Sequence, residues 1–595
     1  MTWPRPVPLV GDTTSADQRA AEPGAWAFPD QDRDAFYEVV FSRRDIRRYR
    51  PVPVPLAVMH RVLSAAHSAP SVGHSQPWRF VVVTDPATRE RAAVIALRER
   101  NRQARLLGPQ AGRKMMDLQL DGIREAPVGI VVCCDRRAPA AGVLGRATFA
   151  DADLWSCACA IENMWLAARA EGLGLGWVTL FPPAELIELI GAPEEVETLG
   201  WLCLGFPDER PPQPGLARAG WSKKLALEEV VMRDRWPTDH DVPPPASALR
   251  APGPAAVVNA RDGSDRLLAP PGALGALDRY LDQLASAGVG AGALAALVMA
   301  GADHPVSRHG VSAYPQSVTR EIMEATLAGQ SMGASLARAT GMQVFAIDAG
   351  IDGPAIDGAL ASRPPGPRGD LCVSDALDQA DVAELLSAGH RLGTAMVREK
   401  SYKVVALGEV GIGNTTVAAA LAAGLLGLPA DEVAGLGAGS DTAILEKKRQ
   451  VISAALKRAA TQTSSRGPLE PQALLGVLGG PEIAFLAGVV LGVGASGGVV
   501  VLDGLATSVA ALCAVRAEPG AAGYLVAGHV SRETAHRLVL DELGLEPLLD
   551  LRARCGEGTG AVLAWQLLRT GLQARATAAK TQASEGAEPR TSAAR

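Results

Sequence analysis

Residues 404–416 read VVALGEVGIGNTT, and this stretch indicates the fold of the second half of the chain. It starts with an apolar run that suits a short buried strand, and a glycine-rich loop then leads into an alanine-rich helix. Backbone N–H groups at the start of such a helix attract an anion. No lysine precedes Thr415 and Thr416, so nucleoside-triphosphate hydrolysis by a Walker A loop is excluded. The stretch predicts a parallel α/β sheet with an anion site at the strand's carboxyl end.

The alternation of strands and helices continues on both sides of this stretch. Apolar runs at 344–348 and 499–502 also lead to acidic residues, as expected for parallel strands whose carboxyl ends face a ligand. The run 483–502 carries no charge and is long enough to span a bilayer. Glycines interrupt it from residue 494 to 498, so we expect a buried helix, a turn and a parallel strand instead.

The first half of the chain mixes strands and helices. Apolar runs at 79–84 and 128–134 predict buried strands, and 161–171 predicts a helix that ends at Gly172. A further strand is expected at 176–181. Composition divides the chain into a flexible arm (1–30), a first domain (31–236), a proline-rich linker (237–261), a second domain (262–574) and a disordered tail (575–595).

Length, composition, net charge and cysteine pattern limit the classes of protein to which this chain can belong. The chain has 595 residues, too many for one hydrophobic core, and 48% of them are hydrophobic. A net charge of -6 argues against nucleic acid or an anionic membrane as the main partner. The eight cysteines include no CxxC pair and no histidine spacing suited to zinc, so we expect reduced thiols, no metal and a cytoplasmic protein. The N-terminus has no signal-peptide pattern.

Residues 41–50, FSRRDIRRYR, place five arginines around Asp45. A solvated basic segment is the ordinary interpretation of such a run. Arginines at a helix start can instead hold a phosphate through bidentate contacts. Residues 69–80, APSVGHSQPWRF, follow downstream and favour the second interpretation, because together the two segments resemble the nitroreductase-fold flavoproteins.

This resemblance continues through 120–128, 165–179 and 202–207. Within the fold, the arginine start and the sequence GWVT at 176–179 resemble the 5,6-dimethylbenzimidazole synthase family, whereas ordinary nitroreductases more often have a hydroxyl residue at position 45. The resemblance implies a nitroreductase-like α+β domain that binds FMN. The residues it implies for FMN binding are Arg43, Arg44, Asp45, Arg47, Ser71, His74, Gln76, Gly176 and Thr179.

The synthase resemblance implies that reduced FMN is consumed as a substrate together with molecular oxygen. Asp45 is the candidate base, kept ionised by its arginines, with a salt-bridge role as the alternative. Thr179 is a candidate catalytic hydroxyl where the family usually has serine, and His74 stands where a smaller amide is common. An NAD(P)H-dependent FMN oxidoreductase that recycles its flavin is the other function considered. The glycines at 172–176 follow a helix rather than a strand and do not indicate NAD binding.

Four glycine-rich segments in the second half, 408–416, 435–441, 479–483 and 554–561, carry a second resemblance. Their order, with further matches from 271 to 316 and from 503 to 531, resembles nicotinate-nucleotide–dimethylbenzimidazole phosphoribosyltransferase. The implied fold is a Rossmann-like parallel α/β domain with a small helical subdomain, so the whole chain is expected to be α/β. The implied reaction moves phosphoribosyl from nicotinate mononucleotide to 5,6-dimethylbenzimidazole, giving α-ribazole 5′-phosphate and nicotinate.

That reaction needs a base to take the N–H proton of the benzimidazole, and no metal is required. By resemblance Glu557 is this base, and Glu409 supports the ribosyl cation that develops. A helix-capping role for Glu557 and a solvated helix position for Lys448 are the alternatives. Leu436, Ala438 and Cys555 depart from the family pattern. The residues implied for nucleotide and base binding are Tyr314, Gly411, Asn414, Gly437, Lys448, Ser531 and Cys555.

The two resemblances together predict a bifunctional enzyme in which the first product is the acceptor of the second reaction. A flavin- or benzimidazole-binding sensor fused to an inactive transferase is a non-enzymatic alternative, and the presence of both Asp45 and Glu557 speaks against it. The two families that the chain resembles consist of dimeric proteins, and in nitroreductase-type proteins the flavin site lies between two subunits. We therefore expect at least a homodimer.

Overall fold

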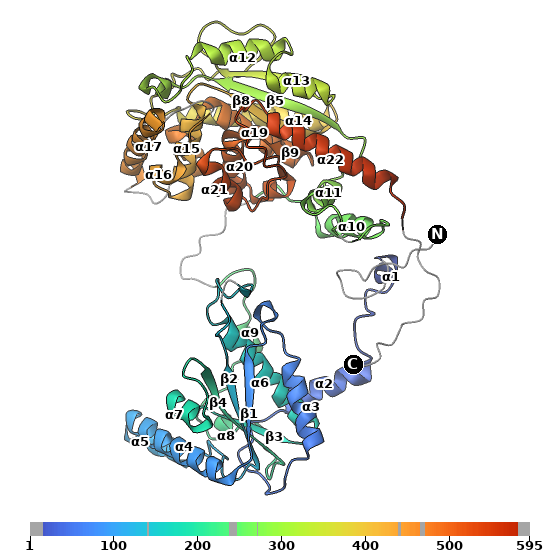
Figure 1. The fold of residues 1–595 in the computed structure, drawn as a ribbon, viewed down its shortest axis with the longest axis vertical. Helices are drawn as coiled ribbons and strands as arrows, with labels where there is room; N and C mark the ends of the chain where they lie inside the picture. The colour runs from blue at the N-terminus through green and yellow to red at the C-terminus, as the bar shows by residue number, and fades with distance from the viewer. Residues whose placement is uncertain are drawn as a thin grey trace. The chain divides into compact units, whose positions relative to one another are not determined.

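The computed structural model describes residues 16–139, 142–236, 247–270, 272–437, 442–463 and 470–580. The first half of the predicted arm, residues 237–246 of the predicted linker, Ala438 and the tail from 581 lie outside the described residues. The chain divides into two compact units, shown in Figure 1. Residues 24–241 form the N-terminal unit, and residues 242–595 with residues 1–23 form the C-terminal unit.

The N-terminal unit is built on a four-stranded antiparallel sheet in the order β1-β2-β4-β3. Strand β2 is fully buried because helices cover both faces of the sheet. Ile130 packs toward the layer of α3 and α6, and the next residue, Val131, packs toward the layer of α4 and α7. The strands are β1 (Trp78–Val83), β2 (Val128–Cys134), β3 (Gly174–Val178) and β4 (Glu197–Gly205).

Helices surround this sheet and confirm an α+β arrangement. The predicted helix at 161–171 is the last part of a longer helix, α6, and the strand predicted at 176–181 begins earlier and ends at Val178. The helices are α2 (Asp30–Ser42), α3 (Leu56–His67), η1 (Val72–His74), α4 (Pro86–Leu106), α5 (Pro109–Asp117), α6 (Ala152–Ala170), α7 (Pro183–Ile190), α8 (Gly215–Arg218) and α9 (Leu227–Val230).

The C-terminal unit contains the predicted parallel sheet, with six strands in the order β10-β9-β8-β5-β6-β7. The chain proceeds outward from β5 through β6 and β7 on one side, and from β8 through β9 and β10 on the other. The order reverses between β5 and β8, and ligands bind at such a point, beyond the carboxyl ends of the strands. The strands are β5 (Leu294–Ala302), β6 (Gln343–Gly350), β7 (Leu360–Ala361), β8 (Tyr402–Val410), β9 (Val499–Leu502) and β10 (Leu525–Ala527).

The helices of this unit pack on both faces of the sheet and on each other (Figure 1). They are α10 (Pro254–Asp265), α11 (Ala276–Ser286), η3 (Pro305–His309), α12 (Ser317–Leu327), α13 (Met332–Ala339), α14 (Gln379–Arg398), α15 (Asn414–Leu426), α16 (Ala430–Val433), α17 (Thr442–Thr463), α18 (Pro471–Leu478), α19 (Pro481–Ala495), α20 (Leu505–Ala517), η4 (Pro519–Tyr524), α21 (Thr534–Glu542) and α22 (Thr559–Thr577).

The uncharged run 483–502 forms the predicted buried helix, turn and strand. Helix α19 ends at Ala495, and β9 pairs in parallel with β8. Helix α14 packs closely against α19 because two residues at the contact have no side chain, Gly389 on α14 and Gly488 on α19. Among the described residues, no helix is both long and apolar enough to cross a membrane. All eight cysteines are free.

In three places a helix lies in, or extends into, a segment that the sequence predicted to be outside the two domains. The predicted arm contains α1 (Ala16–Ala21), whose residue Arg19 lies 3.6 Å from Asp262. The predicted linker contains most of α10, which starts with proline in its first turn and packs on α11. Helix α22 continues past residue 574 to Thr577.

Substituting Gly389 by alanine tests the close contact of α14 and α19. A Cβ at this position would collide with the carbonyl oxygen of Phe485, so Gly389→Ala should lower the free energy of unfolding of the C-terminal unit by about 2–3 kcal/mol. Gly263→Ala on α10 is the matched control, because its Cβ meets nothing within 4 Å and alanine favours the helix by about 1 kcal/mol. Thermal unfolding measures both. Equal melting temperatures would contradict the packing argument.

Candidate active sites

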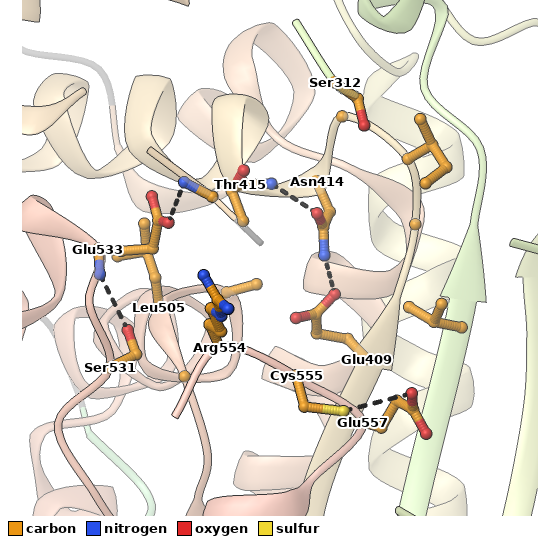
Figure 2. A pocket seen from close by; sticks show the side chains of 18 of the residues that line it. Ser312, Glu409, Asn414, Thr415, Leu505, Ser531, Glu533, Arg554, Cys555 and Glu557 are labelled. Atoms are coloured by element: carbon orange, nitrogen blue, oxygen red, sulfur yellow. Dashed lines mark hydrogen bonds between the residues drawn. The ribbon is translucent and has the colours of Figure 1, made fainter. Parts of the chain in front are cut away.

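A cavity of about 660 Å³ lies at the carboxyl ends of the parallel strands of the C-terminal unit (Figure 2). Its lining comes from loops far apart in the sequence, which the fold brings to the edge where the strand order reverses. Every residue that the sequence assigned to this half lines it: Tyr314, Glu409, Gly411, Asn414, Gly437, Lys448, Ser531, Cys555 and Glu557.

Glu409 stands at the carboxyl end of β8 and is 8% exposed. Its carboxyl accepts a hydrogen bond from the Asn414 side chain at the start of α15. Burial and the nearby Glu482 carboxyl raise the pKa of Glu409 to about 8, although the bond from Asn414 lowers it. The side chain is therefore largely protonated at neutral pH. A cation within about 4–6 Å favours the charged form of a carboxyl, so Glu409 can ionise when a cationic substrate enters.

Glu557 lies in the loop before α22, with a left-handed backbone conformation at φ 59°. The Gly333 N–H, in the first turn of α13, donates to its Oε2 at 3.0 Å. The Cys555 thiol donates to its Oε1 at 3.5 Å (Figure 2). Burial and Glu557 raise the pKa of Cys555 to about 12, so this thiol keeps its proton. The helix-capping contact weighed as an alternative is thus present, and the same carboxyl also lines the cavity.

Asp503 holds the loop that carries Glu557. Its carboxylate accepts backbone N–H groups of Gly558 at 3.1 Å, Gly560 at 2.7 Å and Ala561 at 3.2 Å, at the start of α22. The His529 Nε2 atom lies 3.3 Å from the same carboxylate. In the sequence, Asp503 stood out only as part of a motif. Its signal was an acidic residue directly after a buried strand.

Lys448 on α17 is 3% exposed, so the alternative of a solvated helix position is wrong. Its Nζ donates to Thr415 Oγ1 at 3.1 Å and to the Gly435 carbonyl at 3.2 Å. Burial lowers the pKa of Lys448, and the Glu533 carboxylate opposes this shift. Glu533, which the sequence analysis missed, accepts the Gly437 N–H at 2.7 Å. Together Lys448 and Glu533 hold this glycine loop against α15.

Ser531 lies on the opposite side of the cavity from Glu409, and Arg554 lies between them (Figure 2). The Ser531 N–H donates to Nδ1 of His536 at 2.9 Å, and Nε2 of the same ring lies 3.0 Å from Ser508 Oγ. Burial lowers the pKa of His536 to about 3, so the imidazole is neutral and its Nε2 carries the proton. A buried neutral ring therefore sets the position of Ser531. Arg554 was not assigned by the sequence analysis.

Asp45 forms the centre of the candidate flavin site in the N-terminal unit. The Trp177 N–H donates to its Oδ1 at 3.2 Å, and Arg47 Nη2 pairs with its Oδ2 while also donating to the Trp177 carbonyl at 2.8 Å. The salt-bridge role is therefore real. Burial raises the pKa of Asp45, and Arg47 and Arg43 oppose this shift, so the expectation that the arginines keep this carboxyl ionised stays a prediction. The side chain remains 40% exposed.

The arginines of this segment have different partners. The Arg43 guanidinium lies 4.7 Å from the centre of the Trp165 ring, and Arg44 donates to the carbonyls of Phe41 and Pro212 at 2.8 and 3.0 Å. Arg47 is mostly buried, and its Nη1 atom has no hydrogen-bond partner. A buried guanidinium N–H without a partner is costly, and an anion is the natural acceptor for it.

The predicted loop of Ser71, His74 and Gln76 lies apart from this arginine segment. Both segments contact α6, Arg44 through Trp165 and the loop through Ser156. Nine residues of helix separate these contacts, or about 13 Å. Within one chain the structure brings Asp45, Arg47 and Gly176 together, with Thr179 exposed just after β3, and it does not bring the loop to them.

The loop itself has an unusual backbone. His74 and Gln76 have φ of 54° and 47°, in the left-handed region that side chains other than glycine rarely adopt. Internal contacts hold this conformation: the Gln76 N–H donates to Ser71 Oγ at 3.1 Å, and the His74 and Gln76 side chains lie 2.9 Å apart. Strain of this kind clusters at ligand sites.

Comparison with known proteins assigns both units. Residues 249–585, more than half of the chain, match the phosphoribosyltransferase family model. A nicotinate-nucleotide–dimethylbenzimidazole phosphoribosyltransferase from Thermus thermophilus is 40% identical over 324 residues, which make up 53% of this chain and 94% of that protein. The chain belongs to this phosphoribosyltransferase family. The protein of the same name from Desulforamulus reducens is 36% identical over 336 residues, covering 55% of this chain and 93% of its own length.

Solved structures and a second family model complete the comparison. The crystal structure of CobT from Thermus thermophilus covers 54% of this chain and 96% of its own, at 38% identity and a TM-score of 0.51. Residues 40–206 match the nitroreductase family model. The chain is thus a fusion of a nitroreductase-family unit with a phosphoribosyltransferase unit, and both predicted folds are confirmed.

Replacing Glu409 by glutamine tests its buried protonated state. The pKa is raised from 4.5 to about 8 in the folded protein, so the unfolded chain loses this proton first and stability falls as the pH rises between these values. Glu409→Gln removes the titrating group and keeps an acceptor for Asn414. Its stability relative to the natural chain should therefore grow by about 3–5 kcal/mol from pH 4.5 to 8. Calorimetric unfolding across this pH range measures the difference in stability between the variant and the natural chain. A difference that does not change with pH would contradict the raised pKa of Glu409.

Proposed function

We propose that the chain is a bifunctional enzyme of cobalamin lower-ligand synthesis. The C-terminal unit transfers phosphoribosyl from nicotinate mononucleotide to 5,6-dimethylbenzimidazole, and the N-terminal unit produces that base from reduced FMN and oxygen. One observation supports the first activity most: a single cavity collects all nine residues that the sequence assigned to it. The second activity rests on Asp45 and its arginine neighbours.

In the transferase reaction, the cationic pyridinium of nicotinate mononucleotide leaves C1′ as nicotinate, and one benzimidazole nitrogen attacks this carbon. The other nitrogen gives its proton to the Glu557 carboxylate, which Gly333 and the Cys555 thiol hold in place. Glu409 ionises as the positive charge enters and supports the ribosyl cation. Backbone groups near Gly437 and the Ser531 hydroxyl hold the phosphate, and Lys448 faces the base pocket.

Substituting Glu557 by glutamine keeps the size of the side chain and removes the base. We expect α-ribazole phosphate formation from nicotinate mononucleotide and dimethylbenzimidazole to fall by about 10²–10⁴-fold in kcat, the contribution typical of general base catalysis. Glu546→Gln is the matched control, because this exposed carboxylate on the same unit pairs with Arg279 and does not line the cavity. Equal turnover of Glu557→Gln and the natural chain would remove the base assignment and favour a purely structural capping role.

In the synthase reaction, the residues present fit an anionic flavin. Arg47 has a buried N–H without a partner beside Asp45, and Arg43 is partly exposed next to it, which suits the phosphate or the electron-rich ring edge. Bound reduced FMN would supply the carbon skeleton of the product and react with oxygen. Asp45, held by the Trp177 N–H and raised in pKa by burial, would accept a proton from the ribityl carbon or the ring.

The loop of Ser71, His74 and Gln76 fits a site completed by a second copy. The loop and the arginine segment contact α6 at positions about 13 Å apart, so each chain carries two incomplete halves of the flavin site. We therefore place FMN between the subunits of a homodimer, where the loop of one copy and the arginine segment of the other enclose it. The fusion raises the local concentration of the base near the transferase.

Asp45→Asn tests the fragmentation chemistry. With reduced FMN and oxygen, mass spectrometry should detect dimethylbenzimidazole from the natural chain and about 10²–10⁴-fold less from the variant. FMN binding should persist, because asparagine still accepts the Trp177 N–H. Asp208→Asn, an exposed carboxylate near Arg50, is the control and should keep full activity. Recovery of intact, recycled FMN from the natural chain would contradict fragmentation and favour the NAD(P)H-dependent oxidoreductase.

A further inference from the structure

A cluster of three potential metal ligands lies outside the cavity of the C-terminal unit. His309 ends the short helix η3, and Asp370 and Cys372 lie on one turn before α14. One ligand atom of each residue, an imidazole nitrogen, a carboxylate oxygen and the thiol sulfur, lies within 4.8 Å of the other two. His309 Nε2 and Asp370 Oδ2 are already in contact at 2.7 Å. The fold gathers these groups although His309 and Asp370 stand 61 residues apart.

Backbone contacts hold the turn in the shape that this cluster needs. The Asp370 carbonyl accepts the N–H groups of Val373 and Ser374 at 2.9 Å each, and its Oδ1 accepts the Cys372 N–H at 3.0 Å. The Arg458 side chain donates to the Leu371 carbonyl at 2.9 Å. One carboxylate oxygen is therefore used inside the turn. The other, Oδ2, is directed at His309 on the same side as the Cys372 sulfur.

We propose that His309, Asp370 and Cys372 bind a divalent transition-metal ion of the zinc type. Imidazole, carboxylate and thiolate form a ligand set that suits Zn²⁺ or Co²⁺ and disfavours Mg²⁺ and Ca²⁺, which prefer oxygen ligands alone. In a tetrahedral site with bonds of about 2.0–2.3 Å, the ligand atoms lie roughly 3.3–3.8 Å apart. His309 and Asp370 need to separate by roughly 1 Å to reach this geometry.

The three groups meet the other requirements of a metal site. The His309 side chain is 39% exposed, so an ion can reach the cluster from solvent, and water can complete the tetrahedron. Binding releases the thiol proton of Cys372 to solvent and forms a metal–sulfur bond, with no change in oxidation state. The adjacent pair Asp303 and His304 does not compete, because His304 is buried against Glu482 at 3.1 Å.

Because the site lies next to the catalytic cavity, a bound ion would affect the wall of that cavity. None of its three residues lines the catalytic cavity, but His309 closely precedes the segment from Val311 to Tyr314, which does. A bound ion would tie the start of this segment to the turn that Arg458 anchors. The ion would thus rigidify one wall of the cavity without touching the substrates.

Cobalt titration of the full chain, stripped with a chelator, tests the proposal. One equivalent of Co²⁺ should produce visible d–d bands and a near-ultraviolet band from thiolate-to-cobalt charge transfer. Cys372→Ser should lose the thiolate band, and His309→Ala should weaken cobalt binding by about tenfold or more, as loss of one ligand implies. Cys159→Ser is the matched control and should leave both bands unchanged, because Cys159 is an exposed thiol outside the cluster.

The competing assignment is an ion pair between His309 and Asp370 with an unrelated thiol beside it. In that case cobalt gives no charge-transfer band, or gives one that Cys372→Ser retains, and either outcome would overturn the proposal. Zinc content after dialysis against trace Zn²⁺ gives a second measure, with one ion per chain expected and far less in Cys372→Ser. Circular dichroism of each variant separates loss of a ligand from loss of the fold.

Discussion

The C-terminal unit depends on the carboxylate of Asp503. Two neighbouring parts of the fold meet there: β9 ends immediately before it, and α22 begins where its oxygens accept three backbone N–H groups. A buried carboxylate is stable only when such donors satisfy it, and a helix N-terminus supplies both the donors and a favourable dipole. This contact fixes the loop that carries Glu557. The backbone N–H of Glu557 in turn donates to the carbonyl of Glu409 at 3.2 Å and joins the loop to β8.

Several carboxyl groups lie close together around this contact, and their burial costs free energy. Asp503 is satisfied by backbone donors, whereas Glu409 responds to its carboxyl neighbours with a pKa of about 8. A buried carboxyl that is largely protonated at neutral pH suits a reaction that needs a group able to ionise in response to an incoming cation. Positive charge comes from Lys448, which is buried, and from Arg554, which lies between Glu409 and Ser531 (Figure 2).

The N-terminal unit shows a different organisation. Its sheet and helices form a complete core, yet its candidate ligand contacts are divided between a segment at Asp45 and a strained loop at His74. Exposed side chains and an unpartnered Arg47 N–H mark surfaces that a ligand or a second copy would cover. The residues assigned to the transferase, in contrast, all line one cavity of the C-terminal unit.

The assignment of residues to the cavity came from the family resemblance, but the sequence by itself determined the parallel sheet and the order of its glycine loops. These follow from local patterns: an apolar strand, a glycine loop and a helix start are readable within a dozen residues, as in 404–416. Only the tertiary structure decided which side chains are buried, how their pKa values shift and which groups they contact. The burial of Lys448, the raised pKa of Glu409 and Asp45, the contact of Glu557 with α13 and the meeting of His309 with Cys372 all depend on segments distant in sequence. Desolvation and pairing are set by what packs around a group, and neighbours along the chain do not reveal that.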